Sequence, residues 1–129
     1  MQCFHVAAGI LRNEGGQVLI TERTEAGPFY GLWEFPGGKI HAGEAAMVAL
    51  KRELLEELGI EVTAVEPFMN LTHEYPDRTV DLEFFVVPAW RGEPTGLEGQ
   101  SLRWVDISDL RADELLPADA PIVELLQTQ

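Results

Sequence analysis

The chain has 129 residues, of which 46% are hydrophobic and 24% are charged, and this balance suits a single globular domain covering residues 1–129. Its net charge of −13 argues against a basic groove for DNA or RNA. The sequence contains no apolar run of about 18 residues, so no membrane span is predicted. The only cysteine, Cys3, has no partner for an internal disulfide, so we expect a protein of the reducing cytoplasm.

The first third of the chain contains strand and turn signals. Residues 6–11 and 17–21 are apolar and predict two strands, the second returning along the first after a turn at residues 13–16. Glycine and proline recur so often over residues 24–43 that this stretch predicts a long loop, in which residues 32–35 fit a short strand.

The clearest helix is predicted over residues 44–58. Apolar side chains at i, i+3, i+7 and i+11, counted from Met47, define one buried face. Gly59 stands at the position where many helices end in a left-handed residue.

The second half of the chain predicts more strands than helices. Further strands are expected at residues 60–65, 68–73, 79–88 and 102–105, with a helical turn at 106–110 and a terminal helix at 121–127. Together these elements predict an α+β fold in which a mixed β-sheet lies between helices, an α/β/α sandwich.

Three glutamates project from the polar face of the predicted helix. Glu53, Glu56 and Glu57 are spaced i, i+3 and i+4, which places their Cβ atoms ~5–6 Å apart. Like charges this close repel one another, so the cluster favours a hard divalent cation, Mg²⁺ or in its place Mn²⁺. The same spacing is common by chance on a solvated helix surface, and the three positions alone would favour that interpretation.

The surrounding residues complete a pattern that resembles the Nudix box. Its defining positions are filled by Gly38, Glu44, Arg52-Glu53-Leu54, Glu56-Glu57 and Gly59-Ile60. Almost the whole chain is also similar to the MutT branch of that family, with matching segments at residues 33–39, 75–78, 92–94, 98–100 and 116–119. The resemblance implies the Nudix fold and Mg²⁺-dependent hydrolysis of a nucleoside triphosphate to monophosphate and pyrophosphate. The leading substrate is 8-oxo-dGTP, whose removal from the nucleotide pool prevents mutation.

The resemblance also implies a set of metal ligands. Glu56 and Glu57 match the family's ligands, and the carbonyl of Gly37 is expected to join them. Glu53 matches a position that acts as ligand or general base, and Glu98 matches a loop carboxylate that reaches the metal or the water. Which of Glu53 and Glu98 accepts the proton stays open.

Three further box residues are expected to support these ligands. Arg52 should hold a box carboxylate through a bidentate pair, although an exposed ion pair of little energetic value is the alternative. Glu44 is expected to orient the loop or to assist the metal from behind its ligands, and Gly38 lets the backbone approach closely because it lacks a Cβ atom.

The substrate-binding residues are assigned from the same resemblance. Arg23 matches an arginine that contacts phosphate, and Phe35 matches a residue lining the base pocket. Glu34, Pro36 and Gly37 belong to the same stretch, and Arg78 borders the nucleotide site without a defined role.

Asp119 departs from the pattern, because the best-known MutT-type enzymes carry asparagine there. An amide both donates and accepts hydrogen bonds, as the edge of 8-oxoguanine requires, whereas an ionised aspartate only accepts. A protonated Asp119 would imitate the amide if burial raised its pKa, and an ionised one would suit an exocyclic amine. Alternatively, Asp119 caps the terminal helix.

Three other functions remain open at this stage. The nearest is a pyrophosphohydrolase of CTP, dCTP or oxidised pyrimidine nucleotides, which Asp119 would distinguish. A non-catalytic nucleotide-sensing module and an acidic domain without a metal site are disfavoured by the complete set of box carboxylates. We expect a monomer whose partner is a free nucleoside triphosphate, not a nucleic acid polymer or a membrane.

Overall fold

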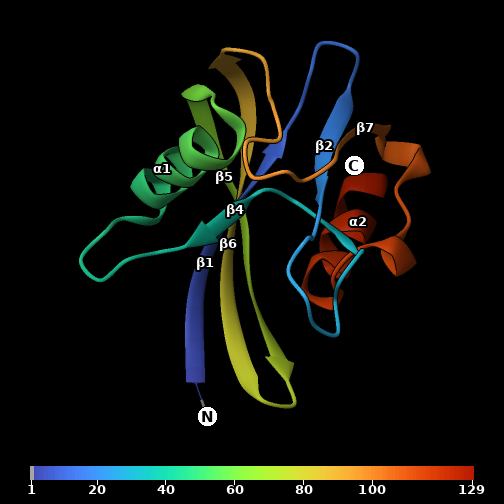
Figure 1. Ribbon diagram of the computed structural model, residues 1–129. Helices are drawn as coiled ribbons and strands as arrows, with labels where there is room; N and C mark the ends of the chain where they lie inside the picture. Colours follow the sequence, from blue (N-terminus) through green and yellow to red (C-terminus); the bar gives the residue numbers. More distant parts are fainter. Residues whose placement is uncertain (1) are drawn as a thin grey trace.

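The computed structural model describes residues 2–129, and its centre is built from two β-sheets with a helix on either side (Figure 1). The four-stranded sheet has the order β4-β1-β6-β5 and the three-stranded sheet the order β3-β2-β7. The strands are β1 (Gln2–Leu11), β2 (Gln17–Glu22), β3 (Trp33–Glu34), β4 (Gly37–Lys39), β5 (Glu61–Tyr75), β6 (Arg78–Arg91) and β7 (Leu102–Asp106). The long helices are α1 (Ala46–Leu58) and α2 (Ala120–Gln127), and short 3₁₀ helices are η1 (Ile107–Asp109), η2 (Ala112–Glu114) and η3 (Pro117–Asp119).

The larger sheet is mixed, because β1 pairs with β6 in parallel while β4 and β5 pair antiparallel to their neighbours. The α+β sandwich predicted from the sequence is confirmed. The pairing of the first two strands is not: β1 lies between β4 and β6, whereas β2 pairs with β3 and β7 in the other sheet. The strands therefore form two β-sheets and not the single sheet that the sequence predicted.

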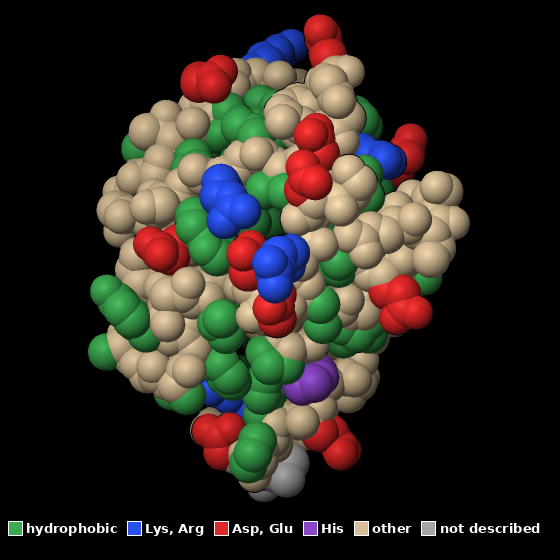
Figure 2. All heavy atoms as spheres, turned by 90° about the vertical axis from the view of Figure 1, so that its right-hand side faces the viewer, with side chains coloured by type: hydrophobic (Ala, Val, Ile, Leu, Met, Phe, Trp, Pro, Cys, Tyr) green, Lys and Arg blue, Asp and Glu red, His purple; other side chains and the backbone are tan. Residues whose placement is uncertain are grey.

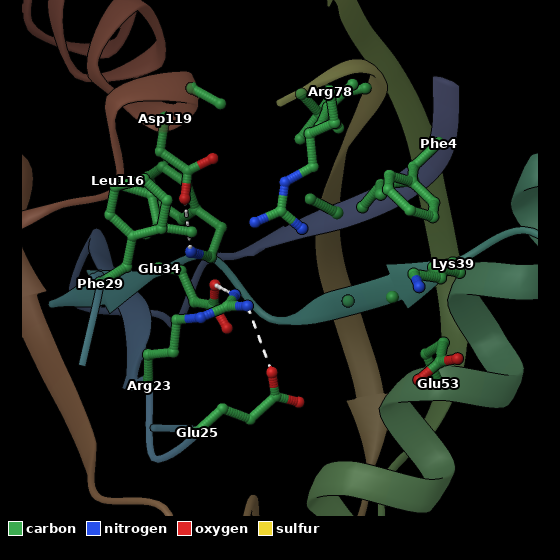
Figure 3. Close-up of a pocket in the computed structure, with 18 of the residues that line it drawn as sticks. Phe4, Arg23, Glu25, Phe29, Glu34, Lys39, Glu53, Arg78, Leu116 and Asp119 are labelled. Atoms are coloured by element: carbon green, nitrogen blue, oxygen red, sulfur yellow. Dashed lines mark hydrogen bonds and ion pairs between the residues drawn. The ribbon is translucent and has the colours of Figure 1, made fainter. Parts of the chain in front are cut away.

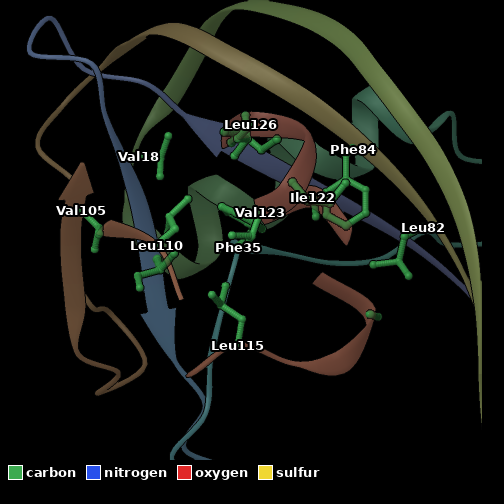
Figure 4. Close-up of a cluster of buried hydrophobic side chains, with 14 residues drawn as sticks. Val18, Phe35, Leu82, Phe84, Val105, Leu110, Leu115, Ile122, Val123 and Leu126 are labelled. Carbon is green, nitrogen blue, oxygen red and sulfur yellow. The ribbon is translucent and has the colours of Figure 1, made fainter. Parts of the chain in front are cut away.

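Two buried clusters hold the layers together, one on each side of the larger sheet. Side chains of β1 alternate between them: Ala8 and Ile10 join α2 and the smaller sheet, and Ala7 and Leu11 join α1. Figure 4 shows the first cluster, in which Ile122, Val123 and Leu126 of α2 pack beside Val18 and Phe84. The helix α1 buries its predicted apolar face through Ala49, Leu50, Leu54 and Leu58.

Several element boundaries differ from the predicted ones for reasons of non-local pairing. The strands predicted at 60–65 and 68–73 form the single strand β5, whose register shifts near Pro67 let it continue through a residue that cannot donate to the ladder. The strand β4 lies inside the predicted loop, where it pairs with Val6–Ala8 of β1. The helix α1 begins at Ala46 rather than at residue 44.

Acidic side chains outnumber basic ones in the chain, 22 against 9. Figure 2 shows the face that carries α2, where the few basic side chains lie beside acidic ones. Two such pairs are Arg111 with Asp113 at 3.0 Å and Arg103 with Glu114 at 3.6 Å. In the described residues, no helix combines the length and apolar character that crossing a bilayer requires.

Candidate active site

A cavity of about 520 Å³ opens between the end of α1, the strands β1 and β4, the β5–β6 hairpin and η3 (Figure 3). The predicted site residues that line it are Arg23, Glu34, Phe35, Gly37, Gly38, Glu53, Glu57, Arg78 and Asp119. Those that lie outside its lining are Pro36, Glu44, Arg52, Glu56 and Glu98. The structure therefore brings most of the predicted site residues together at one cavity, although they are spread over nearly a hundred residues of sequence.

Arg52 connects the helix to the loop before it. Its Nε and Nη2 atoms donate to the two carboxylate oxygens of Glu44, each at 2.9 Å, and its Nη1 atom donates to Glu53 Oε1 at 2.8 Å. The hydrogen bonds from Arg52, and then that from the backbone N–H of His41, lower the pKa of Glu44 to about 2. Arg52 also donates to the carbonyl of Lys39 at 3.0 Å, so one guanidinium joins α1, β4 and the intervening loop.

Glu53 packs directly against the glycine strand. A Cβ atom added to Gly38 would collide with the Glu53 carboxylate, and one added to Gly37 would collide with the carbonyl of Ala7. Gly37 is therefore required by its close approach to the backbone of β1, whereas a side chain at position 38 would force the Glu53 carboxylate to move. With Oε1 of Glu53 bound to Arg52, Oε2 remains free of side-chain hydrogen bonds within residues 2–129.

Glu57 lies deeper, and its surroundings disfavour its charge. Burial, followed by repulsion from Glu53, Glu98 and Glu34, raises its pKa to about 8, against a lowering hydrogen bond with the Gly37 backbone. Four carboxylates thus converge on this point although they come from three separate parts of the chain.

The loop carrying Glu98 is held at the end of α1 by the helix's own unsatisfied carbonyls. The carbonyl of Glu57 accepts from the backbone N–H of Leu97 and from the side chain of Gln100, both at 3.1 Å. Gln100 Oε1 in turn accepts from the backbone N–H of Glu98 at 2.9 Å. Gln100 is therefore a positioning residue that sequence reasoning missed, although it lies in one of the matching segments.

The box carboxylates supply the oxygen donors that a divalent cation prefers, but within the described residues no three of Glu53, Glu56, Glu57 and Glu98 bring their oxygen atoms within 4.8 Å of one another. Arg52 is the cation that contacts these carboxylates among the described residues, at 2.8 Å from Glu53 and 3.7 Å from Glu56. Glu56 is exposed and lies on the rim, on the same helix turn as Glu53 and Glu57. Burial first, and then repulsion from neighbouring carboxylates, raises the pKa of Glu57, and an ion with a strong preference for oxygen ligands would stabilise its charged form.

Asp119 forms the opposite end of the cavity. It occupies the position before α2, but its side chain makes no capping hydrogen bond to that helix. It turns inward instead, where Oδ2 accepts from the backbone N–H of Phe35 at 3.2 Å (Figure 3). Burial, followed by repulsion from Glu34, raises the pKa of Asp119 to about 8, while the Phe35 N–H and Arg23 act in the lowering direction. The predicted helix-capping alternative is wrong for the side chain.

Two arginines flank the middle of the cavity. Arg23 Nη1 lies 3.1 Å from Glu34 Oε2, and its Nη2 lies 3.3 Å from Glu25. Arg78 extends from β6 into the cavity, with its guanidinium carbon 5.9 Å from the ring centroids of Phe4 and Tyr75. The Nε atom of Arg78 is buried without a hydrogen bond within the described part of the chain, although it lies 3.5 Å from Asp77 Oδ1 in an ion pair.

Apart from Phe35, the aromatic residues of the cavity wall were not predicted. The rings of Phe29 and Tyr75 lie with their centroids 5.3 Å apart and their planes tilted by 56°, and the Tyr75 hydroxyl accepts from the backbone N–H of Ala118 at 3.3 Å. Leu116 closes the same side in Figure 3, and Phe4 lines the far end. For Tyr75 and Leu116 the matching segments at 75–78 and 116–119 were a usable signal, whereas nothing local distinguishes Phe4.

Comparison with known proteins defines the class. The chain matches the NUDIX domain family over residues 4–126, so it belongs to that family and is a Nudix hydrolase.

Within the family, it is 46% identical to the 8-oxo-dGTP diphosphatase of Haemophilus influenzae over 94% of this chain and 89% of that protein. It is 41% identical to the 8-oxo-dGTP diphosphatase of Escherichia coli over 98% of both, and 36% identical to the CTP pyrophosphohydrolase of that organism over 96% and 91%. A solved MutT structure from work on Aliivibrio salmonicida and Vibrio cholerae has a TM-score of 0.83 and 38% identity, and the match covers 97% of each chain.

Proposed function

We propose that the protein is a Mg²⁺-dependent 8-oxo-dGTP diphosphatase, which converts the triphosphate and water to 8-oxo-dGMP and pyrophosphate. The carrying observation is that one cavity has a carboxylate cluster at one end and the buried carboxyl group of Asp119 at the other. Such a cavity suits a ligand with a polyphosphate at one end and a base at the other. Its work would be to clear oxidised nucleotides from the cytoplasmic pool and so to limit mutation during DNA replication.

The residues that would hold Mg²⁺ are Glu53, Glu56, Glu57 and Glu98 with the carbonyl of Gly37. When bound there, the ion neutralises polyphosphate charge and favours the hydroxide form of water. Mn²⁺, which takes the same oxygen ligands, would substitute for it.

Glu53 is well placed to accept a proton from the attacking water. Arg52 binds one of its oxygens and leaves the other free, so the side chain is oriented without losing its acceptor. Glu98 is the alternative base, since the Gln100 contacts hold its loop near Glu57. Glu44 acts on neither water nor phosphate in this proposal, because both of its oxygens are bound to Arg52.

Arg23, Lys39 and Arg78 are the basic side chains that line the cavity. Arg23 and Arg78 would orient the phosphates and the sugar from opposite walls, with Glu34 fixing the Arg23 guanidinium. The aromatic ring of Phe35 completes the base end, and Pro36 supports it from outside the lining, because its carbonyl accepts from Gly9 N–H at 2.8 Å and anchors the segment. We also propose that the protein acts as a monomer.

Asp119 would recognise the oxidised edge of the base as a neutral acid. Its raised pKa keeps the carboxyl protonated near neutral pH, so one oxygen donates to O6 of 8-oxoguanine and the other accepts from N7–H. Guanine has no hydrogen on N7, and an acceptor facing it would be left unsatisfied.

The second candidate is a pyrophosphohydrolase of CTP, dCTP or oxidised pyrimidine nucleotides. An ionised Asp119 favours it, because a carboxylate accepts from the exocyclic amine of cytosine. The similarity to a CTP pyrophosphohydrolase supports the same alternative.

A competition assay distinguishes the two candidates. The protein is incubated with Mg²⁺ and equal amounts of 8-oxo-dGTP, dGTP, dCTP and 5-hydroxy-dCTP, and each monophosphate is followed as it appears. Preferential loss of 8-oxo-dGTP supports the proposal, and preferential loss of a cytidine nucleotide replaces it with the second candidate. A Glu53→Gln sample run in parallel corrects for spontaneous hydrolysis and contaminating phosphatases.

A further inference from the structure

A second group of metal-binding side chains lies on the opposite face of the strands that form the cavity. Cys3 and His5 are two residues apart on β1 and therefore point to the same side of the sheet. Asp81 stands beside His5 on β6 in the parallel ladder. In Figure 1 the N-terminal part of β1 and the adjoining part of β6 extend beyond α1, so the helix leaves this row open to solvent.

The distances within this group match those around a tetrahedral ion. The Cys3 Sγ and Asp81 Oδ2 atoms are 3.5 Å apart, the His5 Nδ1 and Asp81 Oδ2 atoms are 3.6 Å apart, and one ligand atom from each residue lies within 4.8 Å of the others. With bonds of about 2.3 Å to sulfur and about 2.0 Å to nitrogen and oxygen, tetrahedral zinc separates these pairs by about 3.5 and 3.3 Å. The side chains would therefore need only small movements.

The orientation of Asp81 is fixed from the neighbouring strand. Thr72 on β5 donates its hydroxyl hydrogen to Asp81 Oδ1 at 2.6 Å, and this bond directs Oδ2 toward Cys3 and His5. A hydrogen bond to the outer oxygen of a carboxylate is the usual way in which proteins orient a metal ligand. Both β1 and β5 therefore contribute to the geometry around Asp81.

The chemistry of the donors differs from that of the box carboxylates. Thiolate, imidazole and carboxylate together favour Zn²⁺, Co²⁺ or Ni²⁺, whereas an all-oxygen set favours Mg²⁺. The two groups are also separated by the sheet, because Phe4 and Val80, which adjoin Cys3 and Asp81 in sequence, line the cavity on the other face. Different ions would therefore occupy the two places without competing.

We propose that Cys3, His5 and Asp81 form a binding site for a zinc-class divalent cation, with water at the fourth position. The ion would join β1 to β6 behind the nucleotide cavity. All three side chains are accessible, with His5 and Asp81 exposing 63% and 39% of their side-chain surface, so an ion reaches them without any opening of the fold.

The test is a titration with Co²⁺ in excess Mg²⁺, followed by absorption spectroscopy. Cobalt bound to a thiolate gives a ligand-to-metal charge-transfer band in the near ultraviolet, and Cys3 is the only cysteine in the chain, so the band reports on this site alone. We expect a band that saturates at one Co²⁺ per chain and disappears in Cys3→Ser. His5→Ala and Asp81→Asn should each weaken Co²⁺ binding by at least about tenfold.

Glu83→Gln is the matched control, since Glu83 is the next acidic residue on the same strand face, and it should leave the titration unchanged. Absence of the band in the wild-type protein would overturn the proposal. It would also be overturned if His5→Ala and Asp81→Asn bound Co²⁺ as tightly as the wild type, because Cys3 would then capture the ion by itself. The readout is spectroscopic and does not depend on the proposed nucleotide hydrolysis.

Discussion

The protonation state of Asp119 predicts that substrate preference depends on pH. With a pKa of about 8, the carboxyl group is about 90% neutral at pH 7 and about 10% neutral at pH 9. Only the neutral form donates a hydrogen bond to O6 of 8-oxoguanine, and the ionised form instead favours an amine. The preference for 8-oxo-dGTP over dCTP should therefore fall about tenfold between pH 7 and pH 9 through loss of the neutral form, and about 100-fold if dCTP binds only the ionised form.

The measurement is the ratio of the two kcat/KM values, obtained with both nucleotides competing in the same tube at each pH. Changes in the ionisation of the metal ligands or of the general base affect both substrates and cancel from the ratio. Asp119→Asn is the control, because its amide keeps the acceptor for the Phe35 N–H and carries a donor at every pH. Its ratio should stay flat and should favour 8-oxo-dGTP more than that of the wild type.

Two results would refute this reasoning. A wild-type ratio that does not change from pH 7 to pH 9 would mean that Asp119 does not titrate in the complex or does not contact the base. An equal fall in the wild type and in Asp119→Asn would trace the effect to titration of the nucleotide itself.

Three further predictions concern catalysis, packing and stability. Glu53→Gln should lower turnover by about 10²–10⁴-fold with an unchanged circular dichroism spectrum, and near-normal turnover of the folded variant would remove Glu53 from its role. Gly38→Ala should displace the Glu53 carboxylate, with which its Cβ would collide, so activity and Mg²⁺ affinity should both drop, whereas Gly15→Ala, whose Cβ would meet its nearest atom at 3.5 Å, should leave both unchanged. Asp119 ionises near pH 3.8 when unfolded and near 8 when folded, so the folded state binds the extra proton and stability falls as pH rises between those values. In denaturant titrations the wild type should therefore lose about 4 kcal/mol more than Asp119→Asn between pH 4 and pH 7, because the raised pKa of Glu57 contributes equally to both proteins.

Local patterns were sufficient to predict the functional helix and its charges. The apolar spacing through Leu50 and Leu54 and the glycine at position 59 define α1, and all depend on contacts within a few turns of one helix. The strand β4 could not be predicted in this way, because Gly37, Gly38 and Lys39 have weak strand preferences. They become a strand by pairing with β1, about thirty residues earlier in the chain.

The residues of the candidate site also fall into those that local patterns predict and those that depend on non-local contacts. The box glutamates are set by helical spacing, but the Phe35–Asp119 contact joins positions 84 residues apart, and nothing local indicates that Asp119 is buried. The same holds for the pairing of Arg52 with Glu44, which depends on the path of the loop between β4 and α1. These residues were assigned from the resemblance to a family, and their contacts are seen only in the structure.

The protein and its proposed substrate are both negatively charged, so the cavity must offset the repulsion between them. Its lining contains three basic side chains against five carboxyl groups: Arg23, Lys39 and Arg78 against Glu25, Glu34, Glu53, Glu57 and Asp119. Arg23 is already paired with Glu34 and Glu25, so the basic residues do not by themselves create a positive field for a triphosphate. The protonated forms of Glu57 and Asp119 reduce the opposing charge but do not reverse it. We therefore expect the polyphosphate to bind together with a divalent cation, and the carboxylates that make the protein acidic are what hold that cation in place.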